Sequence, residues 1–322
     1  MWHKTYAVFV STGIFLSCFG FEKLTILTQS PVASGGWVGH PAVNSSILRG
    51  LAALGVNHNF NPRTLAEIGD AVFVPAGQVA LQTAISLKQQ GKIRVLLTGP
   101  NVVARMTELN SIVAHPAVDR FVANCEWTKI FCEGSEPKLH NRVVIWPAGV
   151  DCKYWKPTGN TSMSKQVLVY KKNVDEYFCQ EVEHTLRRYG WQPMRITYGE
   201  YGTDGFKNML NQARFAVFLS RSESQGIALA ECWSCNVPTL VWDIQQPLSY
   251  LEYSIWPVSA APYLTNATGQ FWQNVTEFEG LLQNIDTILA QTQPRDWVLH
   301  NMSDEVCAQK LIDIIHDLET RG

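Results

Sequence analysis

The sequence predicts an α/β protein made of two doubly wound domains. At 322 residues, the chain is long enough for two domains of ordinary size. Short apolar runs typical of buried strands alternate along it with the longer amphipathic patterns of helices. A hydrophobic content of 46% with 17% charged residues describes a chain that buries a substantial core. The formal net charge of -2 gives no electrostatic reason to expect a nucleic-acid partner.

Residues 1–21 form a separate hydrophobic segment with three open interpretations. Lys4 precedes an apolar run from Tyr6 to Phe21, which is the layout of a secretory signal peptide. The run is also close to the shortest length that spans a membrane, although its glycine and hydroxyl residues make it a poor span. In the third interpretation it is an extra hydrophobic segment packed on the fold. The strand expected from residue 23 leaves almost no spacer behind this segment, so its fate stays undecided.

The first domain is predicted over residues 22–151. It opens with a strand at 24–29 and a glycine-rich turn containing Gly35 and Gly36, which leads into a helix. The G-G-x-x-G spacing of this turn differs from the dinucleotide pattern, and no acidic residue follows at the usual distance, so no nicotinamide cofactor is expected. Further strands are expected at residues 71–74, 93–97, 121–124 and 142–146, with a helix over 78–90.

The second domain is predicted over residues 152–302, and an amphipathic helix follows over 303–322. The first strand of this domain ends at Lys171 and Lys172. Open α/β sheets bind ligands at the carboxyl ends of their strands, so these cations are candidates for holding an anion. The alternative is a pair of solvated lysines. The other elements expected are helices over 175–189 and 206–214 and strands over 194–197 and 215–219.

The segment from Glu223 to Pro238 is the most informative part of the chain. Glu223 and Glu231 lie eight positions apart, around a glycine-containing turn that follows a buried strand and opens into a helix. Backbone N–H groups at the start of that helix, from Gln225, Gly226 and Ile227, form a natural seat for phosphate. Carboxylates do not bind phosphate, so the two glutamates suit hydroxyl-rich neighbours of a phosphate, such as a ribose and a hexose.

These residues resemble the E-x7-E signature of retaining GT-B glycosyltransferases, in particular the family 4 group, also called glycosyl transferases group 1. The resemblance extends through Cys235 to Val241, where Asn236 replaces the usual glycine and can adopt the same left-handed backbone angles. It implies a GT-B architecture of two Rossmann-like domains facing a cleft. It also implies transfer of a sugar from a nucleotide-sugar donor, with retention and without a metal ion, to an unknown glycan, lipid or protein acceptor.

The resemblance assigns roles to individual residues. Glu223 would bind hydroxyls of the donor sugar, Glu231 the ribose, and Lys171 or Lys172 the diphosphate, with Ser224 as an adjacent polar candidate. The turn with Gly35 and Gly36 would face the donor phosphates. Many family members carry a catalytic His at the end of a middle strand, where this chain has Gly99-Pro100-Asn101. His40 is the candidate replacement in our assignment, with His115 as the other available histidine. The final helix would cross back onto the first domain.

Two other functions remain open. A secreted two-lobed solute-binding protein would fit the signal-like start but leaves the Glu223–Pro238 segment unexplained. A sugar-nucleotide epimerase would share the fold and use its carboxylates differently. The C-x-x-C pair Cys232 and Cys235 has neither a second pair nor nearby histidines, so no metal site is expected.

An enzyme that draws on cytosolic nucleotide sugars is expected in the cytoplasm, in one interpretation at the inner face of a membrane through residues 5–21. Export or a lumenal location is the alternative if residues 1–21 act as a signal. Asn44, one of five Asn-x-Ser/Thr sequons, lies beside the glycine-rich turn, a poor place for a glycan, which weighs slightly against a lumenal location.

Overall fold

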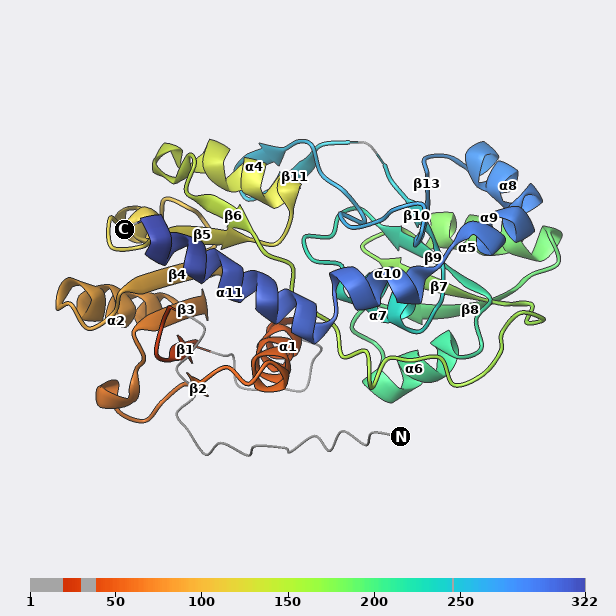
Figure 1. Ribbon diagram of the computed structural model, residues 1–322. Coiled ribbons are helices and arrows are strands. Elements are labelled where there is room, and N and C mark those ends of the chain that lie inside the picture. The colour runs from red at the N-terminus through yellow and green to blue at the C-terminus, as the bar shows by residue number, and fades with distance from the viewer. Residues whose placement is uncertain (1–19, 30–38, 245, 322) are drawn as a thin grey trace, which may run out of the picture.

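The computed structural model describes residues 20–29, 39–244 and 246–321. These residues form two α/β domains side by side, with one long helix lying across the first of them (Figure 1). Every strand pairing within the two large sheets is parallel. The predicted fold class, two Rossmann-like doubly wound domains, is confirmed. The hydrophobic segment predicted at the N-terminus lies outside the described residues, apart from its last two positions.

The first sheet has six strands among the described residues, in the order β2-β1-β3-β4-β5-β6. They are β1 (Leu24–Ile26), β2 (His58–Phe60), β3 (Ala71–Ala76), β4 (Val95–Asn101), β5 (Arg120–Ala123) and β6 (Val143–Ile145). The prediction from sequence missed β2, because His58–Phe60 is short, polar and partly exposed and so carries no buried-strand pattern.

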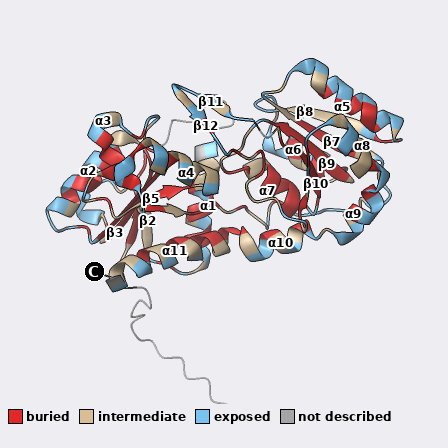
Figure 2. Ribbon diagram, turned by 90° about the horizontal axis from the view of Figure 1, so that it is seen from above, coloured by how far each residue is buried: buried red, intermediate tan, exposed pale blue. Residues whose placement is uncertain are grey.

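Helices cover both faces of the first sheet. They are α1 (Gly39–Ala53), α2 (Gln78–Gln89), α3 (Glu108–Ser111) and α4 (Glu126–Ser135), with single 3-10 turns at η1 (Leu65–Glu67), η2 (Ile112–Ala114) and η3 (Pro137–Leu139). One core cluster joins the sheet to α2, and a second joins it to α1 and the long C-terminal helix. Figure 2 shows the buried residues concentrated in the strands of both domains.

The second sheet has five strands among the described residues, in the order β13-β10-β9-β7-β8. They are β7 (Gln166–Lys172), β8 (Gln192–Thr197), β9 (Phe215–Ser220), β10 (Thr239–Trp242) and β13 (Gly269–Trp272). Its helices are α5 (Glu176–Arg188), α6 (Thr203–Leu210), α7 (Ile227–Ser234), α8 (Val275–Gln283), α9 (Ile285–Gln291) and α10 (Pro294–Asn301). A small antiparallel hairpin, β11 (Leu248–Tyr250) and β12 (Tyr253–Ile255), stands apart from the sheet.

The helix α11 (Asp304–Arg321) leaves the second domain and packs on the first. The chain crosses between the domains at Val150, whose N–H donates to the Met302 carbonyl, and again at Ser303, which pairs with Val150. The Trp146 indole donates to the Cys307 carbonyl at 2.7 Å, which fixes α11 to the end of β6. Gly50 allows α1 and α11 to approach closely, because a Cβ there would lie 2.2 Å from the Asp304 carbonyl oxygen.

Both sheets follow one plan. In each, the first strand lies between the second and the third, so the strand order reverses next to the first strand. Ligands of open α/β sheets bind outside the carboxyl ends of the strands at this reversal point. In the second domain the point lies between β7 and β9, which end at Lys172 and Ser220. The fold therefore places the Lys171–Lys172 pair and the Glu223 loop side by side.

Candidate active site

A cavity of about 170 Å³ lies where the two domains meet. Gly39 and Ala42 of α1 contribute the first-domain wall. The second-domain wall comes from β7, the loop after β8, and the turn and helix after β9: Tyr170, Lys172, Tyr198, Tyr201, Glu223, Ser224, Gln225, Gly226, Ile227, Ala228 and Glu231. Seven of the residues predicted from the sequence thus line one cavity.

Glu223 and Lys172 form a two-point ion pair at this cavity. The Lys172 Nζ lies 2.8 and 2.9 Å from the two carboxylate oxygens of Glu223. The Ser220 hydroxyl donates to the same carboxylate at 3.3 Å, and the Lys172 ammonium lies 4.5 Å from the centre of the Tyr198 ring. Both side chains of the pair are less than one-fifth exposed, so their charges face the cavity with little screening from bulk water.

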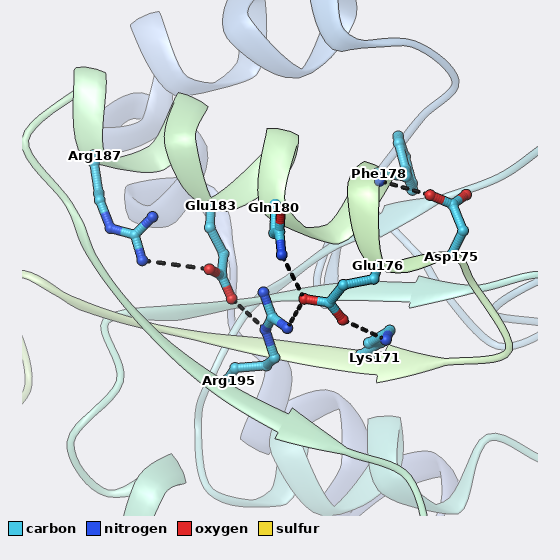
Figure 3. Close-up of polar contacts among 8 residues, drawn as sticks. All are labelled: Lys171, Asp175, Glu176, Phe178, Gln180, Glu183, Arg187 and Arg195. Carbon is cyan, nitrogen blue, oxygen red and sulfur yellow. Dashed lines mark hydrogen bonds and ion pairs between the residues drawn. The ribbon is translucent and has the colours of Figure 1, made fainter.

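Lys171 lies on the other face of β7 and does not line the cavity. Successive side chains of a strand point to opposite faces, so one neighbour of the pair faces the cleft and the other faces α5. The Lys171 Nζ is 2.7 Å from Glu176 on α5, in a network with Arg195 and Glu183 (Figure 3). Hydrogen bonds from Lys171 and Arg195 lower the pKa of Glu176 to about 2. The structure therefore brings Lys172, and not Lys171, to the other predicted residues.

The turn before α7 presents the helix N-terminus to the cavity. Gly226 is the N-cap residue and has a left-handed backbone with φ of 68°, a conformation that favours glycine. No side chain caps this helix end. The N–H groups of the first turn have no carbonyl partners within a helix, so here they face the cavity ready for an anion. The Gln225 side chain instead bonds to the Ala148 backbone in the first domain.

Glu231 is buried one turn further along α7. Only 5% of its surface is exposed, and this burial raises the pKa of the Glu231 carboxyl to about 8. The same residue borders a second hollow lined by Tyr154, Thr203 and Arg49. At neutral pH the carboxyl is largely protonated, so it can both donate and accept a hydrogen bond.

Three further predicted residues are described only in part or not at all. Gly35 and Gly36 lie outside the described residues. His40 is in the first turn of α1, but its side chain lies outside the description as well. His115, the other histidine considered, accepts a hydrogen bond from the Ala117 N–H at 3.0 Å and does not line the cavity.

The prediction from sequence missed a contribution of the first domain to the Glu223 loop. The Trp127 indole, at the start of α4, donates to the Glu223 carbonyl at 3.0 Å. Asn124 Nδ2 lies 3.5 Å from the Ser224 hydroxyl. Both residues follow β5 directly, and the rule that ligands gather at the carboxyl ends of strands could have pointed to them.

The remaining observations concern the two thiols of the C-x-x-C pair, metal binding and membrane spans. Cys232 and Cys235 are buried as free thiols, and burial raises the pKa of Cys235 to about 12. Within the described ranges, no group of three or more His, Cys, Asp or Glu residues could hold a metal ion. Of the helices that the structure describes, none is long and apolar enough to cross a membrane.

Comparison with known proteins gives structural neighbours but no sequence relatives. No protein-family model matches this sequence, and no curated protein matches it. The fold is similar to that of sucrose-phosphate synthase from Thermosynechococcus elongatus, at 11% identity and a TM-score of 0.59 over 93% of this chain and 100% of that one. It is also similar to the apo form of the lipopolysaccharide outer core galactosyltransferase WaaB, at 12% identity and a TM-score of 0.53 over 91% and 99% of the two chains.

The fold is GT-B. The same arrangement occurs in UDP-GlcNAc 2-epimerase from Methanocaldococcus jannaschii, at 12% identity and a TM-score of 0.51 over 93% of this chain and 100% of that one. At these identities the likeness shows the fold alone, and that fold carries both transferases and an epimerase. The choice between them depends on the residues of the cavity.

Proposed function

We propose that this chain transfers a glycosyl group from a nucleotide-sugar donor to an acceptor, with retention of configuration and without a metal ion. One observation carries the proposal: Glu223 and Glu231 line one cavity, together with an uncapped helix N-terminus and Lys172. In the enzymes that the sequence resembles, the E-x7-E motif supplies the two glutamates and the helix N-terminus, and a basic residue at the end of the first strand of the second domain contacts the diphosphate.

The α7 N-terminus and Lys172 would hold the diphosphate. Negative charge grows on the departing diphosphate as the glycosidic bond breaks, so groups fixed in place before the reaction stabilise the transition state. A helix end contributes roughly 0.3 to 2 kcal/mol toward an anion. The Lys172 ammonium adds a full positive charge, and the binding of a diphosphate would compete with Glu223 for it.

Glu231 would bind the ribose. A protonated carboxyl donates to one hydroxyl and accepts from its neighbour, and it adds no negative charge beside the diphosphate. Glu223, at the other side of the α7 N-terminus, would then hold hydroxyls of the donor sugar. Ser224 would add a hydroxyl next to Glu223, and Tyr198, which also lines the cavity, would stack on the base.

A sugar-nucleotide epimerase is the second candidate, because one structural neighbour is named as such an enzyme. Both activities need a nucleotide sugar in this cavity, but they leave different products. Transfer or hydrolysis releases a nucleoside diphosphate, whereas epimerisation can leave the nucleotide sugar intact with an inverted sugar centre.

The decisive experiment measures nucleoside diphosphate release from a panel of nucleotide sugars, together with chromatography of the sugar that remains. Wild type is compared with Glu231→Ala and with Glu181→Ala, a control at an exposed carboxylate on α5. Release with one donor, lost only in Glu231→Ala, supports transfer and identifies the donor. An inverted sugar without release supports the epimerase. Binding of no nucleotide sugar at all would refute both and favour a solute-binding protein.

Retention has a separate test. NMR of the transferred sugar reports the anomeric configuration of product and donor directly. A product with the same anomeric configuration as the donor supports retention, and an inverted product contradicts it.

A further inference from the structure

The main chain at Glu223 is held from both domains. Within the second domain, the Glu223 N–H donates to the Ser259 carbonyl at 2.9 Å. From the first domain, the Trp127 indole N–H donates to the Glu223 carbonyl at 3.0 Å. The peptide groups on both sides of the Glu223 Cα are thus fixed, and one of the two bonds crosses the domain boundary.

Trp127 belongs to a face of α4 that lies against the second domain. Trp127 and Phe131 lie four positions apart on α4 and therefore on one face of it, and Asn124 lies in the turn just before the helix. The Phe131 ring packs edge-on against Tyr253, with ring centres 5.3 Å apart, and the Tyr263 hydroxyl donates to the Asn124 carbonyl. Figures 1 and 2 both show the β11–β12 hairpin beside α4. The Trp127 bond is therefore part of an extended contact between the domains.

The groups assigned to the nucleotide do not depend on Trp127 in this way. Lys172, the first turn of α7 and Glu231 all belong to the second domain, and the Lys172 ammonium bonds within that domain to Glu223. The carboxylate assigned to the donor sugar is different, because its main chain is fixed by a first-domain side chain. The first domain contacts the turn before α7 separately, through the hydrogen bonds between Ala148 and Gln225. Loss of the Trp127 bond therefore acts directly on the Glu223 end of the site and not on the nucleotide end.

We propose that Trp127 is a positioning residue, which fixes Glu223 for the donor sugar only when the two domains are in contact. The inference rests on the proposed function and deepens it. Losing the indole N–H would leave the Glu223 carbonyl without this partner and free the loop to shift. The nucleotide would bind as before, while the donor sugar would be held less accurately. Trp127 thus couples the approach of the domains to the chemical step.

The experiment uses Trp127→Phe, which keeps an aromatic ring and removes the N–H donor. The matched control is Trp242→Phe, since the Trp242 indole makes a similar bond, 3.1 Å to the Gln273 carbonyl, away from the cavity. Turnover of the donor is measured as kcat, and affinity for the nucleoside diphosphate is measured by calorimetry. Small displacements of a reacting group can cost up to about 100-fold in rate, so we expect kcat of Trp127→Phe to fall between about 10-fold and about 100-fold. Affinity for the diphosphate should stay within about 2-fold, as should both quantities in Trp242→Phe.

The inference is overturned if Trp127→Phe keeps the wild-type kcat, or if its diphosphate affinity falls in step with kcat. A second variant separates the effect of the N–H donor from the effect of the smaller ring. Trp127→His retains a ring N–H and should keep a higher kcat than Trp127→Phe; the reverse order contradicts the inference. If the wild type neither binds a nucleoside diphosphate nor turns over any donor, the proposed function fails and this inference fails with it. An active wild type with an unaffected Trp127→Phe refutes the inference alone.

Discussion

Gln225 and Ala148 join the two domains through a pair of hydrogen bonds that imitates a strand pairing. The Ala148 N–H donates to Gln225 Oε1 and Gln225 Nε2 donates to the Ala148 carbonyl, both at 3.1 Å. Both residues are buried, so neither backbone group of Ala148 can turn to bulk water instead. The residue directly before the N-cap of α7 is therefore fixed to the segment that leads out of the first domain.

Gln225→Leu should destabilise the protein. The leucine has a similar volume but leaves the buried N–H and carbonyl of Ala148 without partners, at a cost of about 1 to 3 kcal/mol for each unsatisfied group. Urea unfolding followed by circular dichroism measures the change. Gln283→Leu is the control, because Gln283 is exposed and donates to the Tyr189 hydroxyl at the surface. An equal stability of the two variants would contradict the role assigned to the pair.

Lys172→Met should weaken binding of a nucleoside diphosphate, whereas Lys171→Met should not. A hydrogen bond to a charged group contributes about 1.5 to 3 kcal/mol, so the dissociation constant of Lys172→Met should rise by roughly 10-fold to 100-fold. The neighbouring change removes an ion pair to Glu176 on the far face of β7 and leaves the cavity intact. Calorimetric titration with the diphosphate checks both variants. Equal weakening in the two would mean that long-range charge, and not the position of Lys172, determines affinity.

The buried carboxyl of Glu231 predicts a pH-dependent stability. Burial raises its pKa from the ordinary value of 4.5 to about 8, so between these limits the folded chain binds a proton that the unfolded chain has lost. Stability contributed by this group is present at low pH and is lost as the pH rises toward about 8. Glu231→Gln cannot ionise and lacks this dependence, with a difference of at most about 1.4 kcal/mol per pH unit.

Thermal melts at pH values from about 5 to about 9 test this prediction, because that range spans the raised pKa. The melting temperature of Glu231→Gln minus that of wild type should grow as the pH approaches about 8 and should level off above it. Glu181→Gln, at an exposed position on α5, serves as the control for loss of a surface carboxylate. A difference that does not change with pH would show that Glu231 is ionised in the fold throughout this range.

Gly50→Ala should separate α1 from α11. The added methyl group would lie 2.2 Å from the Asp304 carbonyl oxygen and 2.6 Å from the Ala308 Cβ, so the helices must move apart. Overpacking of this kind costs about 1 to 3 kcal/mol. Gly134→Ala, within α4, is the control: among the described residues, nothing lies within 4 Å of its added methyl group. That change should be neutral or stabilise the protein by up to about 1 kcal/mol, because glycine is unfavourable inside helices. Thermal unfolding distinguishes the two outcomes.

The fold and most of the cavity could be predicted because their signals are local. Apolar runs such as Phe215–Ser220 have the length of a buried strand, and the glycine before α7 marks the turn. Asn236 has φ of 62°, the left-handed angle expected where this chain replaces the glycine of the motif. The segment after Trp242 was predicted poorly, because β11, β12 and β13 have only three or four residues each.

Other features depend on contacts between distant residues, which no local pattern encodes. Lys171 and Lys172 were equal candidates in the sequence, and only the register of β7 decides which one faces the cleft. Trp127 and Glu223 are 96 positions apart, and their bond exists because two domains meet. The raised pKa of Glu231 likewise follows from burial, which the sequence pattern of α7 does not determine.

The long helix α11 reverses the expected order of events during synthesis. Domains commonly fold as units, the N-terminal one first, as the chain emerges from the ribosome. Here Leu311, Ile312 and Ile315 fill part of the same core as Leu24 and Phe73, so one face of the first sheet stays uncovered until residues that are made after the whole second domain are in place. The strands described for the second domain all precede α11. A nascent chain would therefore complete its later half first, and the earlier half would rely on chaperones or on the second domain to keep its open face from aggregating.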